Sequence, residues 1–167
     1  VINTKEFLKS YREEQQTMLA YETNYRHRVR NEATQFASSC NLQPFEGFKD
    51  LPKRCLKPNS EILIWGDSHA RALAQGYSIL SETNEVYSSA TASACPPIID
   101  FDPSDRANCK GFNDDVLNAL VDIKPKNVFL HANWQSYQGI YGEIRDEEEF
   151  LELVSNSLTH LSTLLPD

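Results

Sequence analysis

Two hydrophobic patterns divide the chain. In residues 3–39, apolar side chains recur at steps of four and seven with charged residues between them and no Gly or Pro, which predicts one long amphipathic helix or two in line. The apolar stripe consists of Phe7, Tyr11, Met18, Tyr25, Val29 and Phe36. We therefore expect a helical extension over residues 1–39 and a separate domain over 40–167. Residues 40–60 contain three prolines and a glycine, which predicts irregular, extended chain.

From Glu61 onward, short apolar runs alternate with helical periodicity. Ile62–Trp65 form a continuous apolar run, which is typical of a strand buried on both faces. The further predicted elements are a helix to about Leu80, a strand near 84–89, a helix capped by Asn113 and ended by Pro125, a strand over 127–132, and a helix begun by Asp146 and Glu149. This order predicts an α/β domain with a parallel sheet. A fourth strand is due after the last helix, so we expect the domain to be incomplete at Asp167.

Helical spacing also predicts which side chains face the core. The expected apolar faces are Ala72, Leu73, Tyr77 and Leu80 in the first helix, Val116, Leu117, Leu120 and Ile123 in the second, and Phe150, Leu151, Val154, Leu158, Leu161 and Leu165 in the third.

Composition excludes several classes of function. The net charge is −8, from 16 basic and 24 acidic residues, and no basic stripe is interleaved with aromatic residues, so a nucleic-acid partner is not expected. The longest apolar runs are far below the roughly 20 residues that cross a bilayer. The chain begins with valine and lacks a signal peptide, which indicates a piece of a longer protein.

The four cysteines favour disulfides over a metal site. Cys40, Cys55, Cys95 and Cys109 lack the close CxxC spacing of zinc ligands. Three connectivities are possible, of which the local one, Cys40–Cys55 with Cys95–Cys109, closes two short loops. Oxidised pairs would place the domain outside the cytoplasm, whereas four free buried thiols would fit a cytosolic protein.

The strongest chemical candidate is Ser68, which follows the apolar strand in the run Trp65-Gly66-Asp67-Ser68-His69-Ala70. Gly66 permits a sharp exit from the strand, and the helix that begins near Ser68 would aim free backbone N–H groups at an anion formed there. Asp67 precedes the serine directly, so we interpret it as a helix cap or a turn-ordering residue rather than a catalytic acid.

These residues resemble block I of the SGNH (GDSL) hydrolase family, and the six-residue run is most similar to SGNH domains fused to membrane acyltransferase-3 (AT3) proteins. The resemblance covers roughly residues 40–165 and includes Ser93-Ala94-Cys95-Pro96-Pro97 and Asn133-Trp134. It implies a three-layer α/β/α fold with Ser68 as the nucleophile and Asn133 as an oxyanion-hole donor. Asp67, His69, Ser93, Ala94 and Trp134 would line the site. Where the family has a glycine two residues before the asparagine, this chain has His131.

The general base is not assigned by these residues. The resemblance implies an Asp-x-x-His motif near the end of the domain, and no such motif lies there in this chain. His69 adjoins Ser68, but neighbouring side chains in a helix point about 100° apart, so His69 is expected to shape the pocket. His131 is interpreted as a structural histidine or a pocket-wall residue, and Trp134 and Tyr137 as core aromatics or a flat surface for a sugar. The acidic run 146–149 is interpreted as a solvated helix start, not a metal site.

The resemblance further implies a function. The domain would lie in the periplasm or an equivalent space, behind an AT3 module of the same inner-membrane polypeptide, and would bind no cofactor itself. Acyl groups from cytoplasmic acyl-CoA would pass through that module to Ser68 and then to a cell-surface polysaccharide such as lipopolysaccharide O-antigen, most often as acetyl. Two alternatives stay open, namely a carbohydrate esterase that uses the same serine and a non-catalytic glycan-binding or docking module.

Overall fold

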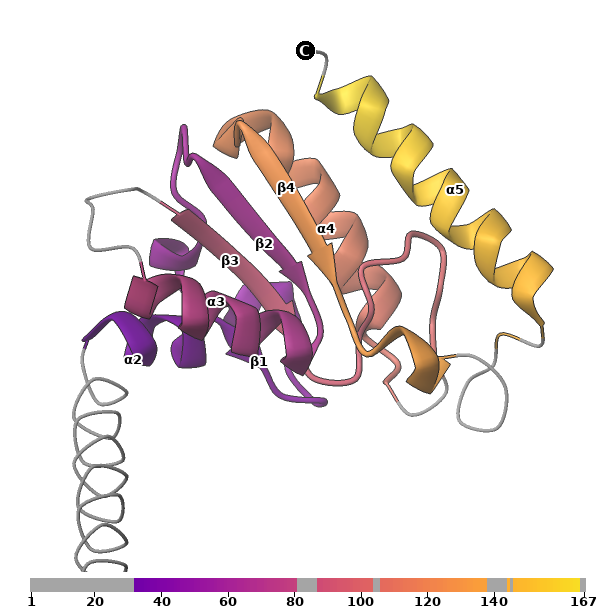
Figure 1. Ribbon diagram of the computed structural model, residues 1–167, viewed down its shortest axis with the longest axis horizontal. Coiled ribbons are helices and arrows are strands. Elements are labelled where there is room, and N and C mark those ends of the chain that lie inside the picture. Colours follow the sequence, from indigo (N-terminus) through magenta and orange to yellow (C-terminus); the bar gives the residue numbers. More distant parts are fainter. Residues whose placement is uncertain (1–31, 81–86, 104–105, 138–143, 145, 166–167) are drawn as a thin grey trace, which may run out of the picture.

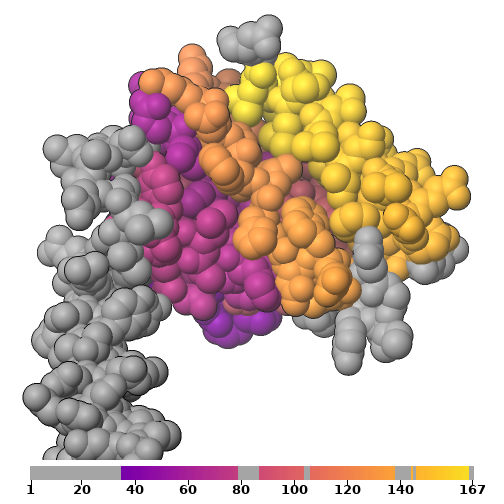
Figure 2. Space-filling model, viewed as in Figure 1, coloured from indigo at the N-terminus to yellow at the C-terminus, as the bar shows by residue number. Residues whose placement is uncertain are grey.

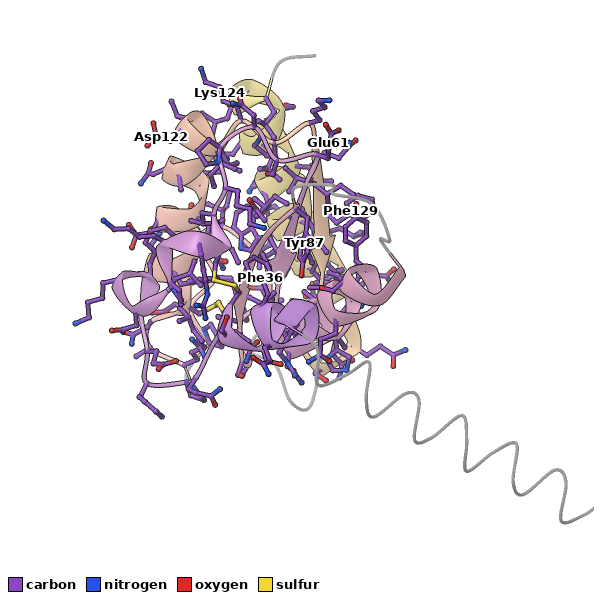
Figure 3. The ribbon with its side chains drawn as sticks, turned by 90° about the vertical axis from the view of Figure 1, so that its left-hand side faces the viewer. Phe36, Glu61, Tyr87, Asp122, Lys124 and Phe129 are labelled. Atoms are coloured by element: carbon purple, nitrogen blue, oxygen red, sulfur yellow. A yellow bond between two sulfur atoms is a disulfide. The ribbon has the colours of Figure 1, made fainter. Side chains whose placement is uncertain are left out.

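The computed structural model describes residues 32–80, 87–103, 106–137, 144 and 146–165. Of the helix expected over 3–39, helix α2 (Glu32–Ser39) falls within these residues, and the rest of the expectation lies outside them. Phe36, the last member of the predicted stripe, packs its ring edge-on against Tyr87 with 5.1 Å between ring centroids (Figure 3). The described end of the extension therefore packs on the domain.

A parallel sheet organises the described residues. Its order is β1-β3-β2-β4, with β1 at Asn41–Leu42, β2 at Ile62–Gly66, β3 at Tyr87–Ala92 and β4 at Asn127–His131 (Figure 1). Every pairing is parallel, which confirms the predicted α/β class. Since parallel strands run in one direction, the carboxyl ends of all four lie at one edge of the sheet. Ligands bind at this edge in open α/β sheets.

Helices cover both faces of the sheet (Figure 1). On one face, α2 and α3 (Ser68–Leu80) pack with Ala37, Ala70 and Ala74 against Ile64. On the other face, α4 (Cys109–Ile123) and α5 (Glu147–Leu164) bury a larger cluster around the strand residues Leu63 and Trp65. Burial of apolar area at about 25 cal/mol per Å² drives both contacts. The predicted three layers are thus present.

The boundaries of three elements differ from the predictions. Helix α4 begins at Cys109, four residues before the predicted cap Asn113. Asn113 lies instead inside the helix, fully buried, where its Oδ1 accepts a hydrogen bond from Trp65 Nε1 at 2.9 Å. Strand β3 reaches Ala92, beyond the predicted end near residue 89, and the edge strand β1 was not predicted. Two short 3-10 turns, Phe48–Asp50 and Lys53–Cys55, follow β1.

The predicted helical faces are right for α4 and partly wrong for α3 and α5. In α4, Val116, Leu120 and Ile123 are buried. In α3 the buried face is Ala70, Ala74 and Ser78, whereas Ala72 and Leu73 are exposed. In α5 the buried residues are Ser157 and Leu161, whereas Leu151 and Leu158 are more than half exposed.

A polar contact explains the rotation of α5. The hydroxyl of Ser157 accepts a hydrogen bond from the backbone N–H of Ile99 at 2.9 Å, which holds this side of the helix inward. Phe150 and Val154 then pack on the cluster around Ile98 and Ile144. Hydrophobic periodicity alone did not show that a serine would face the core.

Two disulfides close the loops, Cys40–Cys55 and Cys95–Cys109, which is the local one of the three possible pairings. The first ties the end of α2 to the second 3-10 turn, and the second ties the loop after β3 to the first residue of α4. Among the described helices, none is both long and apolar enough to cross a membrane.

Strand β4 is only partly buried. Its residues alternate between exposed and half-buried, and Phe129 is 49% exposed. In the space-filling view, the segment that contains β4 lies at the surface between α3 and α5 (Figure 2). Val128 and Leu130 pack on the cluster beneath α4, so one face of the strand is covered and the other is open.

Candidate active site

Ser68 lies at the turn that connects strand β2 to helix α3. It is the first residue of α3 and is half-buried, two residues after the end of β2 at Gly66. Gly66 has a φ of +152°, and a Cβ built on it would lie 1.7 Å from the His131 carbonyl oxygen. Only glycine allows β2 and β4 to approach so closely here. The turn is therefore dictated by Gly66, and it presents Ser68 at the carboxyl edge of the sheet.

Asp67 is the structural centre of this turn. Its side chain is 3% exposed, and its Oδ1 accepts a hydrogen bond from the His69 backbone N–H at 2.7 Å, which caps α3 as predicted. The other carboxylate oxygen, Asp67 Oδ2, accepts from the backbone N–H of Asn133 at 2.9 Å and from the Tyr137 hydroxyl at 2.7 Å. One buried carboxylate thus joins the helix start to the segment that follows β4.

Asn133 lies two residues after β4, beside the same edge of the sheet as Ser68. Its backbone N–H is engaged by Asp67, so the group it can offer to a developing oxyanion is the side-chain amide. Tyr137 is buried, which assigns it to the core rather than to an open surface for a sugar. The sequence did not predict the hydrogen bond between the Tyr137 hydroxyl and Asp67. The one signal for it was that Tyr137 follows Asn133 by four residues.

The loop after β3 supplies a third wall. The Ser93 backbone N–H donates to Leu42 O at 2.8 Å, and the Ser93 hydroxyl accepts from Asn41 Nδ2 at 3.1 Å. Ala94 has a φ of +56°, a left-handed conformation that turns the chain toward Cys95. The predicted site residues Ser93 and Ala94 therefore lie at the carboxyl edge, one strand from Ser68.

Arg106 supports this loop and was not predicted. Its side chain is 1% exposed, and its guanidinium donates to Ser93 O and, at 3.4 Å, to Glu46 O. A buried guanidinium is costly unless its N–H groups have acceptors. Arg106 therefore fixes the loop after β3 relative to the loop after β1. A lone arginine in a polar loop carried no periodic signal that would have distinguished it from a solvated one.

The remaining candidates are more peripheral. The His69 ring is 54% exposed, with its Nδ1 at 3.5 Å from Asp67 Oδ1, so it faces the rim of the turn. His131 is half-buried on β4, and its carbonyl oxygen accepts a long hydrogen bond, 3.4 Å, from the Asp67 backbone N–H. Trp134 packs edge-on against Phe150 of α5 with 6.0 Å between ring centroids. The acidic start of α5 carries Asp146 as its cap, accepting from the Glu149 backbone N–H at 2.9 Å.

The arrangement suits acyl chemistry in part. A nucleophile at a helix N-terminus, a neighbouring asparagine and a turn of backbone N–H groups are the components that bind a developing oxyanion. Within the described residues, no hydrogen bond joins a histidine nitrogen to Ser68 Oγ. Within the same residues, no cluster of three or more His, Cys, Asp or Glu side chains could hold a metal ion.

Comparison with known proteins gives both a family and a fold. The model of the family described as "SGNH domain (fused to AT3 domains)" matches residues 30–163. The chain is also similar to the periplasmic domain of the lipopolysaccharide acetyltransferase of Salmonella ser. Paratyphi A, with a TM-score of 0.59 and 20% sequence identity. That alignment covers 86% of this chain and 52% of the other, so this chain spans about half the length of that domain. A search of curated proteins finds no match.

The structural likeness, at this identity, shows a shared α/β fold. The family match includes the turn at Ser68, the loop with Ser93 and Ala94, and Asn133, and it extends over most of the chain. The chain belongs to the family of SGNH domains that are fused to AT3 domains.

Proposed function

We propose that this chain is the extracytoplasmic SGNH domain of an O-acyltransferase that transfers acyl groups, with acetyl as the first candidate, to a cell-surface polysaccharide such as lipopolysaccharide O-antigen. The observation that carries the proposal is the Asp67 carboxylate, which joins the N-terminus of α3, where Ser68 lies, to Asn133. The family match and the similarity to a lipopolysaccharide acetyltransferase domain support the acyl-transfer class. Two disulfides fit an oxidising compartment.

In the proposed reaction, Ser68 Oγ attacks the carbonyl carbon of the donor's acyl group. The bond from that carbon to the donor's leaving atom breaks, and the serine proton passes to a general base. The Asn133 side-chain amide and backbone N–H groups at the start of α3 stabilise the oxyanion, each donor being worth about 3 kcal/mol of barrier. A sugar hydroxyl then attacks the acyl-serine, its proton leaves through the same base, and Ser68 is regenerated.

The base is proposed to come from residues that follow Asp167 in the intact protein. The related solved domain is about twice as long as the part that this chain matches, so a related domain can contain residues that have no counterpart here. In this scheme the domain itself binds no cofactor, and acyl-CoA is the ultimate donor through an AT3 module in the same polypeptide. The family's description supports the AT3 module.

Transfer and hydrolysis differ only in what attacks the acyl-serine. The test supplies the intact protein with an activated acetyl ester and polysaccharide stripped of its O-acetyl groups, then measures acetate released and acetyl bound to polysaccharide. We expect polysaccharide acetylation that Ser68→Ala abolishes. Acetate alone, at a rate unaffected by the polysaccharide, would replace the proposal with a carbohydrate esterase. No Ser68-dependent product, together with retained polysaccharide binding, would replace it with a non-catalytic glycan-binding module.

A further inference from the structure

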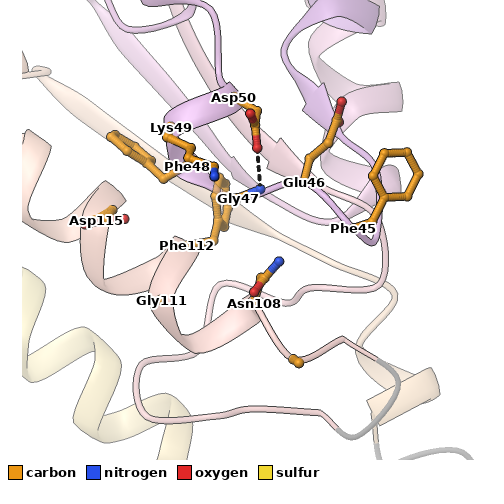
Figure 4. A pocket seen from close by; sticks show the side chains of 11 residues that line it. Phe45, Glu46, Gly47, Phe48, Lys49, Asp50, Asn108, Gly111, Phe112 and Asp115 are labelled. Carbon is orange, nitrogen blue, oxygen red and sulfur yellow. Dashed lines mark hydrogen bonds between the residues drawn. The ribbon is translucent and has the colours of Figure 1, made fainter.

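A pocket of about 660 Å³ lies beside the carboxyl edge of the sheet, between the turn at Phe45–Asp50 and the first turns of α4 (Figure 4). Its volume is within the range of small-molecule sites, roughly 300–1,000 Å³. None of the residues assigned above to acyl chemistry lines it. We propose that this pocket binds an uncharged saccharide unit of the acceptor polysaccharide. The identity of the ligand rests on the proposed function; the site rests on the geometry that follows.

The pocket is positioned to serve Ser68. The turn that lines it follows β1, and β1 and β2 are separated in the sheet by β3 alone, so their carboxyl ends are about 10 Å apart. The loop that carries Ser93 lies between the pocket and Ser68 and is joined to the pocket wall, because buried Arg106 donates to both Ser93 O and Glu46 O. A polymer bound in the pocket can therefore extend one end toward the nucleophile.

Aromatic rings form the apolar part of the pocket. Phe112 is buried at its base, with Phe48 tilted over it at 6.4 Å between ring centroids. Phe45 lies apart from this pair at the opposite end of the pocket and is 82% exposed (Figure 4). Phe45 is therefore open to a ligand from the solvent side of the pocket. Its flat ring suits the C–H face of a sugar.

Fixed polar groups supply hydrogen bonds suited to hydroxyls. Asp50 Oδ2 accepts from the Gly47 backbone N–H at 2.9 Å (Figure 4). Glu46 Oε2 accepts from the Gln43 backbone N–H at 2.7 Å, so both carboxylates are held in place. A carboxylate has further lone pairs beyond one such bond. The third carboxylate of the lining belongs to Asp115.

Asn108 adds a polar group that its helix does not use. It is the N-cap residue of α4, yet its side chain makes no capping hydrogen bond. Asparagine at this position ordinarily accepts from the backbone N–H two or three residues later. Here its amide is directed toward the turn at Gly47 (Figure 4). Its two donors and one acceptor are thus available to a ligand in the pocket.

Charge selects the class of ligand. The lining carries three carboxylates and one ammonium group, that of Lys49, so the pocket is net negative and disfavours phosphate or other anionic ligands. Aromatic faces together with carboxylate and amide groups match a neutral polyhydroxyl ligand. We therefore assign the pocket to an uncharged sugar of the polysaccharide, rather than to the acyl donor.

The test uses saturation-transfer NMR on the full chain, with O-deacetylated oligosaccharides released from the O-antigen of the strain that carries the protein. We expect Phe45→Ala to weaken binding about tenfold, as the loss of one stacked ring would, and Asn108→Ala to weaken it as well. Phe129→Ala is the matched control, since it removes another exposed phenylalanine, on β4 and outside the pocket lining, and is expected to leave the affinity unchanged. The melting temperature of each variant checks its fold.

Absence of binding by the wild-type chain, or equal loss in Phe45→Ala and Phe129→Ala, would overturn the inference. Acylation of Ser68 is measured in parallel on the intact wild-type protein. Binding through Phe45 in a protein whose Ser68 never becomes acylated would retain the saccharide site and refute the acyltransferase. Acylation of Ser68 without binding at Phe45 would retain the acyltransferase and refute the saccharide site.

Discussion

Asp67 Oδ2 accepts a hydrogen bond from the backbone N–H of Asn133 at 2.9 Å, across a separation of 66 residues. This contact connects the residue beside the candidate nucleophile to the candidate oxyanion donor. It also removes the Asn133 backbone N–H from catalysis, so the side-chain amide is left for that role. Asp67 is thus a positioning residue, and its removal is expected to affect both stability and the reactivity of Ser68.

Asp67→Asn tests this connection. The substitution keeps the shape of the side chain but replaces an acceptor oxygen by an NH₂ group, which accepts no hydrogen bond. Whichever way the amide is turned, it loses the bond to the His69 N–H or the bonds to the Asn133 N–H and the Tyr137 hydroxyl, and the charge that strengthens all three is removed. Hydrogen bonds to a charged group are worth about 1.5–3 kcal/mol each, so we expect the free energy of unfolding to fall by about 3 kcal/mol. Tyr137→Phe removes one of these bonds and should cost about 1.5 kcal/mol. Urea denaturation measures both, and an unchanged stability of Asp67→Asn would contradict the assignment.

Replacing Gly66 or Gly76 by alanine should change the stability of the fold in opposite directions. Ala at position 66 would place its Cβ 1.7 Å from the His131 carbonyl oxygen at a φ that disfavours side chains, so Gly66→Ala should lose more than about 4 kcal/mol or fail to fold. Gly76 lies within α3, and a Cβ added there would meet nothing within 4 Å, so Gly76→Ala should gain about 0.5–1 kcal/mol from helix propensity. Thermal unfolding of the two variants gives shifts of opposite sign if the turn is as described.

The two disulfides should contribute similarly to stability but differently to the site. They close loops of similar length, with sequence separations of 15 and 14, so replacing either pair by alanine should cost about 3 kcal/mol by the loop-entropy model. Cys95 adjoins Ala94, so the loss of Cys95–Cys109 should also slow acylation of Ser68, whereas the loss of Cys40–Cys55 should leave that rate closer to wild type. Equal effects on the rate would show that the loop after β3 does not depend on its disulfide.

We expect the free energy of unfolding to fall at alkaline pH because of Tyr87. Burial raises the pKa of the Tyr87 phenol above its ordinary value, an effect partly offset by its hydrogen bond with Ser78. Since the folded protein favours the neutral phenol, this contribution is complete below the unfolded-state pKa of about 10 and is lost as pH rises through the folded-state pKa. Tyr87→Phe should reduce the decline in unfolding free energy between about pH 9 and 11. A decline as steep in Tyr87→Phe as in wild type would exclude Tyr87 as its source.

The sequence predicted the elements whose side chains repeat regularly. The apolar run before Gly66 identified β2, and helical spacing identified the buried face of α4. Strand β1 was not predicted because its two residues, Asn41 and Leu42, are too few to show a hydrophobic period. The start of α4 was predicted wrongly because asparagine is a common helix cap. The Asn113 amide instead lies inside the core, where it donates to Pro96 O at 2.8 Å.

The same distinction holds for the candidate site. Ser68, Asp67 and Asn133 follow strands, and parallel topology was sufficient to predict that they would share an edge. The burial of Arg106 and the use of Tyr137 as a partner of Asp67 depend on contacts between distant segments, at separations of 60 and 70 residues. Such contacts leave no local pattern in the sequence. The catalytic roles of Ser68 and Asn133 stay predictions, as do the site-lining roles of Asp67, His69, Ser93, Ala94 and Trp134.

In the proposed function, Ser68 forms an acyl-enzyme with a base supplied by residues outside this chain. The most direct measurement is the intact mass of this chain, and of the intact protein, after treatment with a fluorophosphonate or an activated acetyl ester, with Ser68→Ala as control. We predict an added mass at Ser68 in the intact protein, much slower labelling of this chain, and none in Ser68→Ala. No labelling of Ser68 in either protein would contradict the account.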